Sequence, residues 1–208
     1  MGIGVTAAVV AAAAEPGPGF WESLRAARQG DPDAQARVGR MFHRGEGVTR
    51  DLAEALRWYR RAADAGNPDG AYGLGVLYAG DPEDTAVFRE KGNRLSRDAL
   101  AMLGIESPQP SVTGTGPDPA GAARWFRRAA RQGHAMAQFR LGLAYLTGSG
   151  LPRDPEEAYF WLGLAVRHLE GADRKAAQAA WEDAGRELSA FRRDETRRRI
   201  RTWRPGRR

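Results

Sequence analysis

Few side chains in this sequence have the types and spacing that catalysis needs. The three histidines, His43, His134 and His168, put too few imidazoles in one place to predict a His-built metal site. There is no cysteine, which excludes a thiolate nucleophile, a zinc finger, an iron–sulfur cluster and a disulfide framework. The sequence also lacks a phosphate-binding glycine loop and a G-x-S-x-G serine. We therefore predict no catalytic residue, no metal site and no cofactor.

The acidic residues that recur at fixed spacing have a structural explanation. Asp51 and Asp154 each precede a predicted helix, with Glu54 and Glu157 three residues later. This is the spacing of a capping box, in which the first side chain accepts a backbone N–H and the second reaches back to the cap residue's own N–H. We assign these carboxylates to helix starts rather than to acid–base catalysis.

Positive charge is concentrated at one end of the sequence. The 208 residues carry a net charge of +6, but residues 191–208 alone carry +7, which leaves −1 for the rest. Cations are favourable at helix C-termini in any case, and no nucleic-acid motif is present, so a nucleic-acid partner is disfavoured. Peripheral contact with an anionic membrane through this tail stays open. The candidate contacts to an anionic partner are Arg197, Arg198, Arg199, Arg201 and Arg204.

The first residues have the composition of an export signal. Residues 3–14 form an uncharged apolar run that ends at Glu15, and Ala12 and Ala14 fit the small-residue positions of a signal-peptidase site. The run is too short to span a bilayer, and no basic residue precedes it. We expect a cleaved signal peptide over residues 1–14 and a periplasmic or secreted protein, with a cytoplasmic protein as the alternative.

Internal repeats indicate how the chain is organised. Residues 30–66 and 133–166 align when Gly39 is placed over Gly142. A further copy lies between them but is split by a 31-residue insertion, and it lacks the Gly-x-Gly turn and its Asp. The signature positions are Gly39, Phe42, Gly45, Gly47, Asp51 and Trp58 in the first copy, Gly75, Tyr78 and Trp125 in the second, and Gly142, Tyr145, Gly148, Gly150, Asp154 and Trp161 in the third.

Each copy has the pattern of two helices joined by a turn. Asp31 and Asn67, each followed by proline, predict helix starts, and the Gly-x-Gly turns at 45–47 and 148–150 predict positive φ angles. A glycine recurs in the middle of each first helix, where it costs about 1 kcal/mol against alanine, so we predict that another helix crosses it closely. Such a hairpin buries its inner face only by stacking on the next copy.

The pattern resembles the Sel1-like repeat family of tetratricopeptide-related αα-repeats. Residues 34–51 read A-Q-x-x-x-G-x-x-F-x-x-G-x-G-V-x-x-D, the match continues over 55–66, and it recurs over 137–161. The resemblance covers about residues 20–170. It implies an all-α fold, a right-handed α–α superhelix, whose members mostly act as adaptors for other proteins. We accordingly expect a non-catalytic scaffold that binds a protein or peptide partner on its concave face.

A long helix is predicted to cap the last repeat, because apolar residues recur there at 4-3-4-3 spacing. Ile200 and Trp203 fall out of phase with this stripe, so we predict a break near Ser189 or Asp194 and a last short helix packed back on the array. The stripe consists of Ala177, Trp181, Ala184, Leu188 and Phe191.

Two alternatives to the scaffold remain open. One is a cell-envelope enzyme or ligand-binding accessory that uses the insertion, and the other is a cytoplasmic regulator whose Arg-rich tail binds nucleic acid or lipid. The expected segments are a signal peptide (1–14), a linker and N-terminal half-repeat helix (15–29), a first repeat (30–66), a second repeat (67–133) with the insertion at about 80–117, a third repeat (134–168), and capping helices with the Arg-rich tail (169–208).

Overall fold

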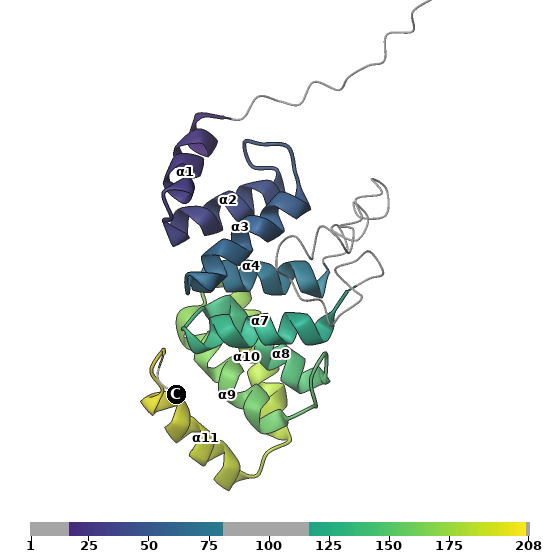
Figure 1. Ribbon diagram of the computed structural model, residues 1–208. Helices are drawn as coiled ribbons and strands as arrows, with labels where there is room; N and C mark the ends of the chain where they lie inside the picture. Colours follow the sequence, from purple (N-terminus) through teal and green to yellow (C-terminus); the bar gives the residue numbers. More distant parts are fainter. Residues whose placement is uncertain (1–16, 81–116, 207–208) are drawn as a thin grey trace, which may run out of the picture.

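The computed structural model describes residues 17–80 and 117–206, so the expected signal peptide and nearly all of the insertion lie outside it. In the described ranges all regular structure is α-helical, which confirms the predicted all-α superhelix (Figure 1). None of these helices is long and apolar enough to cross a membrane. The helices are α1 Pro18–Arg28, α2 Pro32–Arg44, α3 Leu52–Asp64, α4 Pro68–Ala79, α7 Pro119–Arg131, α8 Ala135–Thr147, α9 Pro155–His168, α10 Gly171–Arg186 and α11 Ala190–Thr202.

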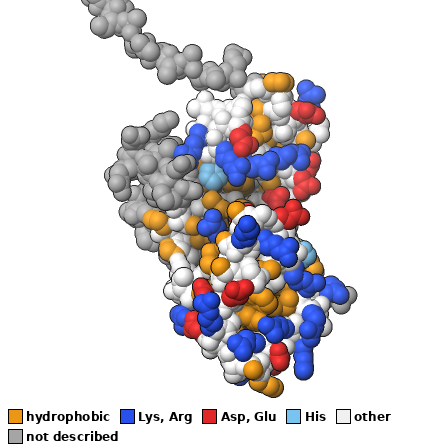
Figure 2. All heavy atoms as spheres, turned by 180° about the vertical axis from the view of Figure 1, so that it is seen from behind, with side chains coloured by type: hydrophobic (Ala, Val, Ile, Leu, Met, Phe, Trp, Pro, Cys, Tyr) orange, Lys and Arg blue, Asp and Glu red, His pale blue; other side chains and the backbone are white. Residues whose placement is uncertain are grey.

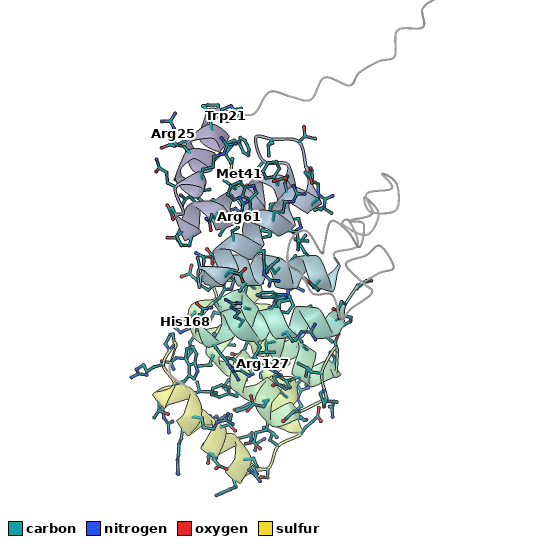
Figure 3. The ribbon with its side chains drawn as sticks, in the orientation of Figure 1. Trp21, Arg25, Met41, Arg61, Arg127 and His168 are labelled. Carbon is teal, nitrogen blue, oxygen red and sulfur yellow. The ribbon has the colours of Figure 1, made fainter. Side chains whose placement is uncertain are left out.

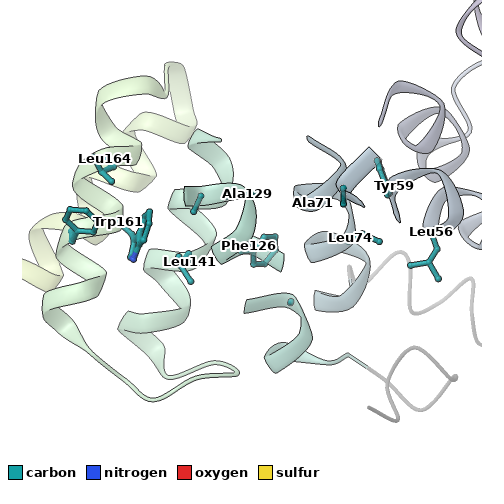
Figure 4. Close-up of a cluster of buried hydrophobic side chains, with 14 of the residues drawn as sticks. Leu56, Tyr59, Ala71, Leu74, Phe126, Ala129, Leu141, Trp161 and Leu164 are labelled. Carbon is teal, nitrogen blue, oxygen red and sulfur yellow. The ribbon is translucent and has the colours of Figure 1, made fainter. Parts of the chain in front are cut away.

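The helices pack as three consecutive pairs. α2 packs on α3, α4 on α7 and α8 on α9, and neighbouring pairs meet through α3 with α4 and through α7 with α8. α1 packs on α2 and α10 on α9, so each end of the three pairs is covered by a further helix. One buried cluster runs through all three pairs and contains Tyr59, Leu74, Phe126 and Trp161 (Figure 4). The repeats are therefore held together by a shared core.

Within each pair, the recurring glycine of the first helix lies against the residue that follows the tryptophan of the second. A Cβ atom on these glycines would lie only 2.5–2.6 Å from a side-chain carbon of that residue. No side chain fits in this space, so the close helix crossing predicted from the glycines is confirmed. The three pairs are Gly39 with Tyr59, Gly75 with Phe126, and Gly142 with Leu162.

The turn inside a repeat is closed by backbone hydrogen bonds. The N–H of Asp51 donates to the carbonyl of Phe42 at 2.9 Å, and the N–H of Asp154 donates to that of Tyr145 at the same distance. The signature aromatic thus contributes its backbone to the turn as well as its ring to the core. The turn glycines lie in the left-handed region, with φ of +73° at Gly45, +69° at Gly47, +76° at Gly148 and +73° at Gly150.

These bonds correct the predicted capping boxes. The Asp51 carboxylate does accept from the N–H groups of Ala53 (2.9 Å) and Glu54 (3.0 Å). The return contact from Glu54 to the N–H of Asp51 is not made, because the Phe42 carbonyl already occupies that donor. Glu54 instead accepts from Arg57 at 2.6 Å. Only half of the predicted box exists.

The second repeat is formed by helices that are distant in sequence. Asp118 lies seven residues before Trp125, the same spacing as in the other repeats. Its carboxylate accepts from the N–H of Gly121 (2.8 Å), and its own N–H donates to the carbonyl of Tyr78 (2.8 Å). The prediction that this copy lacks its Asp is therefore wrong. The insertion moved the residue along the chain, and the pairing of α4 with α7 returns it to its place.

Neighbouring repeats are joined at one carbonyl near the end of each second helix. Gln35 donates its Nε2 to the Ala27 carbonyl at 3.2 Å, and the equivalent Gln138 donates to Ala130 at 3.3 Å. Both glutamines are buried. The second repeat has alanine at this position, and there the Ala63 carbonyl accepts from Arg128 at 2.5 Å. An arginine therefore replaces the missing glutamine.

We expect Arg128→Ala to lower the free energy of unfolding by about 1–2 kcal/mol. The substitution leaves the Ala63 carbonyl unpaired and removes the guanidinium that lies 5.4 Å from the Trp125 ring centroid. Arg57→Ala is the control, because Arg57 forms only an exposed pair with Glu54, and it should change stability by less than about 0.5 kcal/mol. Urea unfolding measures both variants, and equal effects would contradict the assignment.

Two helices close the C-terminal end of the array. The break between α10 and α11 falls at Ser189, as predicted, and the Ser189 hydroxyl accepts from the N–H of Arg192 at 3.3 Å. The inclusion of Phe191 in the covering stripe is wrong, since its side chain is 73% exposed. The new helix that begins after Ser189 changes the phase, which exposes Phe191 and buries Ile200.

Both closing helices approach α9 at Gly163. A Cβ atom there would lie 2.5 Å from Cδ1 of Ile200 on α11 and 2.9 Å from Nε1 of Trp181 on α10. The first two repeats have Arg60 and Arg127 at the equivalent position, two residues after the tryptophan. A glycine therefore stands where the terminal helices need to approach.

Candidate functional site

A groove of about 910 Å³ opens along the first helices of the three repeats. Residues of α2, α4 and α8 line it, together with Arg50 from the α2–α3 turn, Tyr59 from α3, His134 before α8 and Asp173 from α10. On the face seen in Figure 2, Lys and Arg side chains form a band across the upper repeats. We take this charged groove as the candidate binding site on the described residues.

One wall of the groove is a row of arginines on α2. Arg37, Arg40 and Arg44 follow i, i+3, i+7 spacing and so share one helix face. Their side chains are 48%, 53% and 66% exposed. Their ion pairs are exposed ones, at 3.9 Å from Arg37 to Asp31 and at 3.9 and 3.3 Å from Arg40 and Arg44 to Glu46. Such pairs contribute little energy, so these cations can exchange partners readily.

The opposite wall is organised by His134 at the start of α8. Its Nδ1 accepts from the N–H of Ala137 at 3.1 Å, so its Nε2 is the nitrogen that can donate to Asp69, 3.3 Å away. This hydrogen bond lowers the pKa of the Asp69 carboxyl below its ordinary value. The His134 ring also stacks on Tyr72, with centroids 4.4 Å apart. The imidazole is thus held by three contacts that fix its orientation.

Tyr59 lies on the inner side of the groove. Burial raises the pKa of its hydroxyl far above the ordinary tyrosine value, so the phenol stays protonated. Its oxygen lies 3.5 Å from Nδ1 of His43. Among the residues described, no group of His, Asp and Glu side chains could hold a metal ion. The groove offers exposed cations and hydrogen-bond donors, which suit the binding of a ligand.

None of the signature residues predicted from the sequence lines this groove. The signature aromatics lie instead among core residues and under arginines. Arg61 lies over the ring of Trp58 at 4.7 Å, and Arg127 donates to the Tyr145 hydroxyl at 2.9 Å; both arginines are labelled in Figure 3. Trp161 donates its Nε1 to Glu157 at 3.0 Å. The repeat signature therefore describes the packing of the array and leaves the binding surface undefined.

The groove residues were not predicted from the sequence because none of their positions holds the same residue type in all three repeats. Arg37 has Gly73 and Arg140 as its equivalents, two positions before the recurring glycine, and Arg40 has Val76 as its equivalent in the second repeat. A signal was nevertheless present. The position two residues before the recurring glycine lines the groove in all three repeats, and the position directly after it does so in the first two.

The five tail arginines differ in the contacts that they make. Arg197 donates to the Tyr159 hydroxyl at 3.0 Å, and Arg199 donates to Glu157 at 2.9 Å. Arg204 donates to the backbone carbonyl of Trp203 at 2.8 Å. Arg198 and Arg201 are exposed, and their side chains have no ion-pair partner in the described part of the chain. Two of the five predicted contacts thus hold α11 on α9.

Arg199→Ala is expected to loosen α11, at a cost of about 1 kcal/mol. The substitution removes the bond to Glu157 and the guanidinium that lies 4.5 Å from the Phe160 ring centroid. The adjacent Arg198→Ala should leave α11 unchanged. Hydrogen exchange of the α11 amides measures the effect, and faster exchange in both variants would count against a specific role for Arg199.

Stacked helix pairs with a polar groove along their first helices define an α-solenoid of the binding-scaffold class. The chain belongs to the Sel1 repeat family, because the model of the Sel1 repeat matches residues 32–67, 97–134 and 135–168. Proteins of this family generally serve as scaffolds for protein–protein interaction. The second match, 97–134, begins outside the described residues and does not include α4 at 68–79. In the structure it is nevertheless α4 that pairs with α7 to form the second repeat.

Three known proteins show how far the likeness extends. An uncharacterised protein, NMB1327, of Neisseria meningitidis is 30% identical over 61% of this chain and 27% of its own length. The chitin synthase regulator SKT5 of Saccharomyces cerevisiae is 31% identical over 70% of this chain and 23% of its own. A Sel1 repeat protein from Oxalobacter formigenes matches in structure with a TM-score of 0.52 and 26% identity, over 77% of this chain and 98% of that one. The chain spans about a quarter of the length of NMB1327 and of SKT5.

Proposed function

We propose that this protein is a non-catalytic scaffold that binds a segment of another protein in the groove formed by α2, α4 and α8. The observation that carries the proposal is the composition of this groove. Within the described residues, the lining arginines Arg37, Arg40 and Arg140 make no contact that stacks the repeats, whereas the signature residues that pack the helix pairs lie elsewhere. Side chains that the fold does not use remain available to a ligand.

We further propose that the scaffold works in the bacterial cell envelope. The apolar run over residues 3–14, with Ala12 and Ala14 before Glu15, supports export. Two of the similar proteins are bacterial, from Neisseria meningitidis and Oxalobacter formigenes. The intact mass of the protein from its native host should correspond to a chain that begins at residue 15. A full-length mass would overturn the envelope location without touching the binding proposal.

Site-specific photocrosslinking tests the binding proposal. A photoreactive amino acid replaces Arg37 or Val76, which line the groove, or Arg57 or Arg124, which lie on the second helices of their pairs. In the native host the groove positions should give one discrete adduct to the same protein, identified by mass spectrometry. Adducts only from Arg57 and Arg124, or from no position, would overturn the proposed function.

A further inference from the structure

We infer that the groove recognises an acidic segment of its partner, in extended conformation, and this inference rests on the proposed function. The lining contains five arginines, one of which is Arg50 in the α2–α3 turn, and the two aspartates Asp69 and Asp173, so it has an excess of positive charge. The four of these arginines that can grip a ligand from two sides are Arg37, Arg40 and Arg44 on α2 and Arg140 on α8. Guanidinium groups bind carboxylates through two parallel hydrogen bonds, so closely placed arginines favour a carboxylate-rich ligand.

The arginine row has a length that suits an extended polypeptide. Residues 37–44 rise about 10 Å along the α2 axis at 1.5 Å per residue. In an extended segment, side chains on one face recur about every 7 Å. Two or three alternate acidic residues therefore cover the row within the reach of the flexible arginine side chains. A compact single anion would engage only one end of it.

The arginines are available to such a ligand. Arg37, Arg40 and Arg44 are held only by exposed pairs to Asp31 and Glu46, which a partner's carboxylates can replace. Across the groove, Arg140 is exposed and has no ion-pair partner within the part of the chain that the structure describes. The ligand would thus be gripped between α2 and α8.

The two aspartates favour a polypeptide over a nucleic acid. Asp69, which the His134 hydrogen bond keeps ionised, and Asp173 lie in the same lining as the arginines. A nucleic-acid strand carries a negative charge at every residue and would meet these carboxylates unfavourably. A polypeptide can place uncharged residues opposite them and acidic residues opposite the arginines. The same two carboxylates would also repel a uniformly anionic membrane surface.

The inference is tested on the full chain with a fluorescein-labelled octaglutamate peptide. Binding is followed by fluorescence anisotropy at low salt, where exposed charges are least screened. Arg37→Gln, Arg40→Gln and Arg140→Gln combined should weaken the peptide's affinity about tenfold or more, since each loses a charge-assisted bond. The matching Arg→Lys triple variant keeps the charge and should remain well above the Gln variant in affinity.

The control variant combines Arg28→Gln, Arg198→Gln and Arg201→Gln, which removes the same charge from exposed arginines outside the groove. It should bind within about twofold of the unmodified protein, by the usual weakness of distant exposed charges. An equal loss in the control, or equal losses in the Lys and Gln variants with their helicity intact, would overturn the inference. An eight-residue oligothymidylate that bound as tightly, through the same arginines, would assign the groove to nucleic acid instead.

The crosslinking and peptide experiments test the two proposals independently, so a failure of one can be told from a failure of the other. If a groove adduct forms but octaglutamate does not bind, the scaffold proposal stands and the acidic-segment inference is wrong. If octaglutamate binds through the groove arginines but no groove adduct forms in the host, the proposed scaffold function is wrong. The captured protein, once identified, should crosslink through a segment rich in Asp or Glu.

Discussion

Gly150→Ala should lower the free energy of unfolding by about 3 kcal/mol or more. Two costs add at this residue. Its φ of +73° lies in the left-handed region, where a side chain costs about 1–2 kcal/mol. A Cβ atom would also overlap the backbone carbonyl of Pro119, and backbone cannot move aside as a flexible side chain does. Forcing an extra methyl into such a contact costs about 1–3 kcal/mol more.

The equivalent glycine of the first repeat supplies the control. Gly47 has nearly the same φ, +69°, but the nearest atom to a Cβ there is the terminal carbon of Met41 at 3.8 Å. Gly47→Ala should therefore pay only the backbone cost, about 1–2 kcal/mol. Urea unfolding followed by circular dichroism compares the two variants. Equal losses of unfolding free energy in the two variants would contradict the close contact between Gly150 and the backbone of Pro119.

Tyr59→Ala should cost about 3–5 kcal/mol, the usual range for deleting a buried aromatic ring. The ring is 5% exposed and fills the space that two glycines leave open. A Cβ atom added to Gly39 on α2 would lie 2.6 Å from the Tyr59 ring. One added to Gly73 on α4 would lie 2.5 Å from it. Removing the ring leaves a cavity between two repeats, which the rigid helices around it cannot close.

A double-mutant cycle separates this packing from a general loss of burial. Gly73→Ala in the unmodified protein forces a methyl group into the Tyr59 ring and should destabilise by about 1–3 kcal/mol. In the Tyr59→Ala background the same methyl enters the cavity, so its cost should fall or reverse sign. Additive effects in the two backgrounds would contradict direct contact between the ring and Gly73.

The repeat architecture was predictable because its signals are local and recurrent. A glycine in the middle of a helix has an unfavourable propensity, so its recurrence at 39, 75 and 142 required a packing explanation. The identity of the crossing residue was harder to predict, since it changes from Tyr59 to Phe126 to Leu162. Crossing depends on the direction of side chains in three dimensions, which spacing alone does not specify.

The groove was not predictable for the opposite reason. Arg37 and Arg140 occupy equivalent positions, but the second repeat has Gly73 there, so no groove position holds one residue type in all three repeats and a comparison of the repeats passes over these positions. Arg140 is 100 residues from Arg40 in the chain, and only the stacking of α8 beyond α4 brings both into one lining. The Asp118 cap was missed similarly, because the insertion separates it from the helix whose turn it completes.

The return of α11 onto α9 has a consequence for how such a protein changes length during evolution. α10 covers the open side of the third repeat, but α11 packs against α9 and makes few contacts with α10, so the two do not form a fourth pair. The surface on which another repeat would stack is therefore occupied by a structure that is not a repeat. A duplicated repeat can be inserted between two existing repeats or before α1 without disturbing this end. A copy added after α9 would have to displace both closing helices and their contacts at Gly163.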